Sequence, residues 1–150
     1  MPWIKEEEMI IMVCYDYEES DDRVLIAAKS QAEAFDAAVH VVASHPGGHM
    51  EGSGRQKFQK MRTEVEKIEH GLREAKAFFE DAGIPCRTHL CMRGLDAGED
   101  LVLYAREHKV DTIVIGLKKR SRMDKMLFGS TAQYILLNAR VPIVSVPLFF

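Results

Sequence analysis

The sequence predicts an α/β domain in which helices cover both faces of a doubly wound, five-stranded parallel sheet. Short apolar runs of strand length alternate with longer segments whose apolar residues recur at helical spacing. Five such runs and four such segments follow one another, a pattern typical of parallel strands joined by right-handed helical crossovers. The length of 150 residues fits one domain, which we assign to residues 1–150.

The first two predicted strands, residues 9–15 and 38–43, are continuous apolar runs. Such runs suit strands that are buried on both faces of a sheet. Between them, residues 16–22 are rich in acids and offer several N-cap candidates for a helix. The apolar positions of this first helix run from Leu25 to Phe35 at helical spacing.

A Gly-rich stretch at residues 45–54 follows the second strand and is predicted to be a mobile loop. His45 and His49 lie in this loop and could supply two metal ligands. Because no third ligand is evident nearby, we expect both histidine side chains to be solvated.

The clearest element is a long amphipathic helix that ends near Gly83. Its apolar residues recur at alternating steps of three and four along one face: Phe58, Met61, Val65, Ile68, Leu72, Ala75 and Phe79. A coiled coil would give the same spacing. The strands predicted on either side favour a helix that packs on a sheet.

The second half of the chain continues the alternation. Residues 84–91 alternate in polarity, which places this strand nearer an edge of the sheet. Two further helices are predicted at residues 96–108 and 130–139. The last two strands are predicted at residues 111–116 and 142–146.

The composition argues against several classes of protein. No apolar run approaches the roughly 18–20 residues that cross a bilayer. The acidic N-terminus lacks the features of a signal peptide, so we expect a cytoplasmic protein. A net charge of −3 argues against a dedicated nucleic-acid binder. The three cysteines lack CxxC spacing, and we expect them to be small core residues of a reduced protein.

The charge is uneven, because a basic island follows the fourth predicted strand. This island, residues 118–125, holds five basic residues and one acid. It lies between Gly116, which ends the strand, and Gly129, which precedes Ser130 and Thr131 at the start of the next helix. Ligands of parallel α/β sheets bind beyond the carboxyl ends of the strands, and a helix start attracts anions. The island is therefore part of a candidate phosphate site.

These motifs make the chain similar to the universal stress protein family over nearly its whole length. After its fourth strand, that family carries Gly, two residues, Gly, nine residues and Gly-Ser/Thr. Gly116, Gly129 and Ser130 match this pattern. The resemblance implies a Rossmann-like fold that binds ATP or another adenine nucleotide, with or without Mg²⁺. It also implies that Asp16 contacts the nucleoside and that the backbone near Ser44 contacts adenine.

The predicted nucleotide-binding residues come from three strand ends, the basic island and one helix start. They are Tyr15, Asp16, Ser44, Gly116, Lys118, Lys119, Arg120, Gly129, Ser130 and Thr131. Helix capping would also explain Asp16, and an ordinary turn with a Ser N-cap would explain Gly129 and Ser130.

The sequence departs from the family at Lys119, which stands where the second Gly of the motif is expected. If that position needs a left-handed backbone, Lys costs roughly 1–2 kcal/mol more than Gly. We favour the interpretation that Lys119 and its basic neighbours offset phosphate charge directly. The alternative is a degenerate nucleotide site in a nucleotide-free homodimeric interaction module.

We expect a dimeric stress-response sensor or regulator that hydrolyses ATP slowly at most. The sequence contains no paired nucleophile and base, nucleophile elbow or His-rich metal motif. Its final strand begins at Val141 and ends at Pro147, is apolar, and would form a sheet edge. The resemblance implies a homodimer through this strand. The tail, Leu148, Phe149 and Phe150, would then either extend that interface or fold back on its own subunit.

Overall fold

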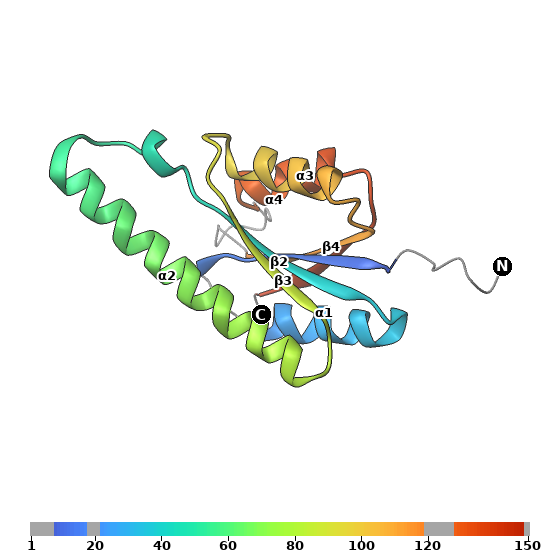
Figure 1. Cartoon of the computed structure of the whole chain (residues 1–150). Coiled ribbons are helices and arrows are strands. Elements are labelled where there is room, and N and C mark those ends of the chain that lie inside the picture. The colour runs from blue at the N-terminus through green and yellow to red at the C-terminus, as the bar shows by residue number, and fades with distance from the viewer. Residues whose placement is uncertain (1–7, 18–21, 119–127, 149–150) are drawn as a thin grey trace.

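The computed structural model describes residues 8–17, 22–118 and 128–148, and its elements follow the predicted order (Figure 1). The strands are β1 (Ile10–Cys14), β2 (Ala38–Ser44), β3 (Cys86–Cys91), β4 (Thr112–Leu117) and β5 (Ile143–Pro147). The helices are α1 (Asp22–Phe35), η2 (Gly47–His49), α2 (Gly54–Asp81), α3 (Ala97–Glu107) and α4 (Ser130–Asn138), of which η2 is a short 3₁₀ turn.

The five strands are parallel and lie in the order β3-β2-β1-β4-β5, which confirms the predicted sheet. β1 lies at the centre, and its Ile11, Met12 and Val13 are at most 1% exposed. β3 and β5 form the two edges. From β1 the chain proceeds to β2 and β3 on one side and then crosses to β4 on the other. The switch point of the sheet therefore lies between β1 and β4.

Helices cover both faces of the sheet, because successive residues of a strand point to opposite sides. One core cluster includes Val13 of β1 and Phe79 of α2, while the other includes Met12 of β1 and Ile135 of α4. Figure 1 shows α3 and α4 above the sheet, with α1 and the end of α2 below it. The predicted doubly wound arrangement is thus confirmed.

The longest helix, α2, extends past the sheet. Of its predicted apolar stripe, Ile68, Leu72, Ala75 and Phe79 are buried, whereas Phe58 is 63% exposed. In Figure 1 the N-terminal half of α2 lies beyond the carboxyl ends of the strands. The helix spans 28 residues, but neither it nor any other helix in residues 8–17, 22–118 and 128–148 is both long and apolar enough to cross a membrane.

Three expectations from the sequence need correction. Phe35 was predicted on the buried face of α1, but it is the last residue of that helix and is 54% exposed. His45 is 2% exposed rather than solvated. All three cysteines are free, but only Cys91 is buried, while Cys14 and Cys86 are partly buried at strand ends.

His45 is buried because both of its ring nitrogens have partners within the protein. Its Nδ1 accepts a hydrogen bond from the backbone N–H of Gly47 at 2.8 Å. With Nδ1 an acceptor, the ring proton lies on Nε2, which is 2.7 Å from a carboxylate oxygen of Glu64 on α2. Lys57 adds a second link by donating to the carbonyl of Gly48 at 2.7 Å. These contacts attach the Gly-rich loop to α2.

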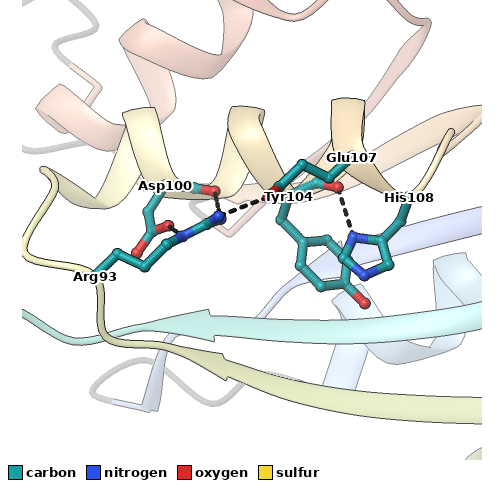
Figure 2. Close-up of polar contacts among 5 residues, drawn as sticks. All are labelled: Arg93, Asp100, Tyr104, Glu107 and His108. Carbon is teal, nitrogen blue, oxygen red and sulfur yellow. Dashed lines mark hydrogen bonds and ion pairs between the residues drawn. The ribbon is translucent and has the colours of Figure 1, made fainter.

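A second polar cluster joins Arg93, which precedes α3, to acidic side chains of that helix (Figure 2). Arg93 donates from Nε to Oδ1 of Asp100 at 2.7 Å, and from Nη1 to Glu107 at 2.6 Å. Asp100 is fully buried, and its Oδ2 has no hydrogen-bond partner among the described residues. The Arg93 guanidinium therefore balances the charge of a buried carboxylate.

The same helix packs aromatic rings against the edge of the sheet. The ring of Tyr104 stacks on His108 at a centroid distance of 3.8 Å. The Tyr104 hydroxyl shares a 2.8 Å hydrogen bond with Nδ1 of His40, a buried residue of β2. Burial, followed by the nearby Arg87 and His108, lowers the pKa of His40 to about 4. His40 is therefore a neutral core residue at pH 7.

Candidate functional site

A cavity of about 300 Å³ lies at the carboxyl ends of β1 and β4, beside the start of α4. This is the switch point of the sheet, where open parallel α/β proteins bind their ligands. The volume lies at the lower end of the roughly 300–1,000 Å³ that is usual for small-molecule pockets. Position and size therefore define a candidate ligand site.

The cavity gathers every predicted site residue that the structure describes. These residues are Tyr15, Asp16, Ser44, Gly116, Lys118, Gly129, Ser130 and Thr131. Lys119 and Arg120 lie outside the described residues, together with most of the basic island. The structure thus brings eight of the ten predicted residues to one cavity, and their role in nucleotide binding stays a prediction.

The start of α4 has the geometry of an anion site. Gly129 is the N-cap residue, with φ −62° and ψ 158°, and no described side chain caps the first turn. Ser130, the N-cap candidate of the sequence, is instead the first residue of the helix. Gln133 donates from its side-chain amide to the carbonyl of Phe128 at 2.7 Å and holds the chain that enters α4. The first N–H groups of a helix have no partner within it, so an anion can accept their hydrogen bonds.

Position 116 requires glycine for a steric reason, in addition to any role that Gly116 has toward a ligand. A Cβ at this position would lie 2.8 Å from Cδ1 of Leu148 and 3.0 Å from Cγ2 of Val24. Leu148 is held there because its backbone N–H donates to the carbonyl of Leu117 at 2.8 Å. Leu148 therefore continues the pairing of β5 with β4 and packs within its own subunit, while residues 149–150 lie outside the described chain.

Tyr15 connects the cavity to α2. Its backbone N–H donates to the carbonyl of Val42 at 2.8 Å, which continues the pairing of β1 with β2. Its ring extends to α2, where a Cβ on Gly71 would overlap the phenol oxygen. Burial, followed by the carboxylates of Glu74 and Asp16, raises the pKa of the Tyr15 phenol. Tyr15 therefore presents to the cavity a neutral ring that α2 holds in place.

Much of the cavity wall could not be identified from the sequence. Tyr17 follows Asp16 by one residue, so the strand-end signal could have identified it. Apolar side chains from distant segments contribute the rest of the missed wall, among them Val24, Leu25, Leu101, Ile135 and Leu148. Four of these residues match the ordinary helical core pattern and Leu148 follows β5, so only the tertiary structure brings them to the cavity.

The described part of the cavity carries both signs of charge. Lys118 is the described member of the basic island that lines it, and Asp16 and Asp22 line it as well. Across residues 8–17, 22–118 and 128–148, no three His, Cys, Asp or Glu side chains are grouped to hold a metal ion.

The sheet order and the cavity at its switch point define a doubly wound α/β protein with a candidate small-molecule site. The family model described as "Universal stress protein family" matches residues 9–147, and the chain belongs to that family. This match confirms the resemblance inferred from the sequence.

Three relatives illustrate the similarity. A universal stress protein structure from Archaeoglobus fulgidus is 34% identical, with a TM-score of 0.76, and the match covers 92% of this chain and 98% of that one. A second structure from the same organism, in complex with dAMP, is 28% identical, with a TM-score of 0.71 and coverages of 92% and 97%. Universal stress protein MJ0531 of Methanocaldococcus jannaschii is 29% identical over 81% of this chain and 68% of its own length.

Proposed function

We propose that this chain binds an adenine nucleotide, ATP, ADP or AMP, in the cavity at the switch point and acts as a stress-response sensor or regulator. One observation carries the proposal: the uncapped start of α4 and a largely apolar wall belong to the same cavity. A nucleotide needs both, because its phosphates are anions and its base is a flat, weakly polar ring. The related Archaeoglobus fulgidus protein in complex with dAMP supports this class of ligand.

In the proposed complex, different residues of the cavity contact the base, the sugar and the phosphates of the nucleotide. The base lies against the apolar wall and meets the backbone near Ser44, and Asp16 accepts a hydrogen bond from the sugar. The phosphates accept hydrogen bonds from the first turn of α4, where Ser130 and Thr131 add hydroxyl donors. Lys118 offsets part of the phosphate charge from the end of β4.

Thermal unfolding with and without nucleotide tests the proposal. A ligand at about 100 times its Kd stabilises the native state by about 2.7 kcal/mol, which raises Tm by about 5–10 °C in a domain of this size. We expect this shift with at least one of ATP, ADP and AMP. Gly129→Val should remove the shift, because a branched side chain at the N-cap obstructs the helix start. Gly48→Val is the matched control, since nothing lies within 4 Å of a Cβ there.

Two results would contradict the proposal. The first is the absence of a Tm shift with all three nucleotides at millimolar concentration. The second is an equal shift in wild type and Gly129→Val. Reversing the charges of Lys119 and Arg120 adds a finer test, because these residues should favour ATP over AMP if they offset phosphate charge. If the charge reversal leaves the preference for ATP over AMP unchanged, the phosphates are bound by the first turn of α4 and not by Lys119 and Arg120.

We also propose that the chain forms a homodimer through β5. β5 is a sheet edge with partly exposed apolar side chains, and α4 exposes Leu136 and Leu137, the latter by 83%. Exposed apolar edges favour pairing with another chain. Light scattering should report a dimer with or without nucleotide. Ser145→Lys on β5 should dissociate it, whereas His89→Lys on the opposite edge should not. A wild-type monomer would contradict this proposal.

A further inference from the structure

The described residues leave an apolar stripe uncovered on the N-terminal half of α2, which we define as residues 54–67. Phe58 is 63% exposed, and Met61 and Val65 are only partly buried. None of the three belongs to either core cluster of the described residues. Figure 1 shows this half of the helix extending away from the sheet. The apolar pattern thus continues beyond the surface that the sheet covers.

The shape of this stripe fits a second helix. Phe58, Met61 and Val65 are spaced by three and four residues, which corresponds to a and d positions of a heptad. Such a stripe is narrow and accepts the side chains of one neighbouring helix between its own. A helix that lies in a membrane surface presents a broader apolar face. Residues 54–67 extend over about 21 Å, a length of nearly four helical turns.

The positions that flank the stripe are mainly basic. Arg55, Lys57 and Arg62 occupy e and g positions beside the apolar residues, with Glu64 as the acid among them. Arg62 also lies 3.3 Å from Glu66, but this pair is exposed and weak, so a carboxylate of a partner can replace it. Glu64 is already engaged, since its carboxylate lies 2.7 Å from Nε2 of the buried His45. A second copy of this helix would place basic side chains opposite basic side chains, which opposes pairing. Charge complementarity therefore selects an acidic partner.

The surface is also held in place before any partner arrives. The contact between His45 and Glu64 fixes the helix to the loop after β2, and Lys57 donates to Gly48 at 2.7 Å. These two contacts restrict the surface before binding, so it loses less conformational entropy when a partner docks.

We propose that the N-terminal half of α2 docks an acidic amphipathic helix of a partner protein. The apolar residues of that helix pack against Phe58, Met61 and Val65. Its Asp and Glu side chains pair with Arg55 and Arg62 along the two sides of the stripe. This surface lies outside the proposed nucleotide cavity, whose lining contains no α2 residue.

Fluorescence anisotropy with two designed peptides tests the proposal on the full chain. Both peptides are three-heptad helices with Leu at a and d. One carries Glu at e and g, and the matched peptide carries Lys there. We expect the Glu peptide to bind with a micromolar Kd and the Lys peptide to bind at least about tenfold more weakly, a difference of about 1.4 kcal/mol.

Variants locate the binding surface. Phe58→Ala should raise the Kd of the Glu peptide about tenfold, because exposed aromatic anchors dominate such interfaces. Phe35→Ala is the matched control, since Phe35 is 54% exposed on α1, and it should leave the Kd unchanged. Reversing Arg55 and Arg62 to Glu should transfer the preference to the Lys peptide. Unchanged thermal unfolding would show that each variant is folded.

Four outcomes would overturn the proposal. Equal binding of the two peptides would remove the charge argument, and the absence of binding at about 100 times the expected micromolar Kd would remove the docking surface itself. A dimer that dissociates in Phe58→Ala would make a second copy of the chain the occupant. Cosedimentation with anionic phosphatidylserine vesicles that depends on Phe58 would make a membrane the occupant.

Discussion

The two halves of α2 carry one continuous apolar pattern but meet different surroundings. In the C-terminal half, Ile68 and Phe79 are completely buried against the sheet. In the N-terminal half, Phe58 occupies an equivalent position of the same stripe and is 63% exposed. Helical periodicity thus identifies the apolar side of a helix. Burial of that side depends on how far the neighbouring sheet extends.

The largest expected effect separates the two halves by stability. Phe79→Ala should lower the free energy of unfolding by about 3–5 kcal/mol, because it leaves a cavity in a closed core. Phe58→Ala should change it by less than about 0.5 kcal/mol, as exposed positions usually do. Urea unfolding of the two variants measures the difference. Similar losses would show that the N-terminal half packs as tightly as the C-terminal half.

Acid should destabilise the sheet and the helices packed on it rather than the N-terminal half of α2. His40 has a pKa of about 4 in the fold against 6.5 when unperturbed, so the unfolded chain binds the proton more readily. The stability that this residue contributes is complete above about pH 6.5 and is lost as the pH falls through about 4, a change of up to about 2–3 kcal/mol.

Urea unfolding at pH 7 and pH 5 measures this loss in wild type and in His40→Asn. The variant should lose less stability than wild type over the same interval, while His70→Asn, which changes an exposed histidine of α2, should follow wild type. Hydrogen exchange in residues 54–67 should change little, because that half opens locally. The same pH dependence in His40→Asn and wild type would exclude His40 as its source.

A smaller loss of stability is expected at the contact between the N-terminal half of α2 and the loop that follows β2. His45→Ala leaves the N–H of Gly47 without its acceptor and removes the partner of Glu64, so we expect a loss of about 1–2 kcal/mol. Hydrogen exchange in residues 54–67 should accelerate at the same time. His70→Ala removes an exposed His–Glu pair of the same helix and should cost less than about 0.5 kcal/mol. Equal effects would contradict a structural role for His45.

The smallest expected effect concerns the boundary between α2 and the cavity. Gly71→Ala adds a methyl group that overlaps the Tyr15 ring, and the displaced ring should weaken nucleotide binding about tenfold, or about 1.4 kcal/mol. The same substitution in a Tyr15→Ala background should have no further effect, because residues in contact are not additive. Nucleotide-induced Tm shifts of the four proteins measure this. If the effects of the two substitutions on nucleotide binding are additive, Gly71 does not act through the Tyr15 ring.

The order of elements could be predicted from the sequence because strand and helix periods differ clearly along the chain. The strand ends and the start of α4 could also be located, and eight predicted site residues meet in one cavity. The burial of His45 could not be predicted, since its partner Glu64 lies on another element. The contact of Gly116 with Leu148 could not be predicted either, because it joins the ends of two neighbouring strands at the sheet edge.

Backbone amide NMR with stepwise addition of AMP tests the central claim most directly, because it reports where a nucleotide binds. We expect saturable chemical-shift changes at Tyr15, Ser44, Gly116 and the first turn of α4, with little change at residues 54–67. Changes confined to other parts of the chain, or none at millimolar AMP, would contradict a nucleotide site at the switch point of this sheet.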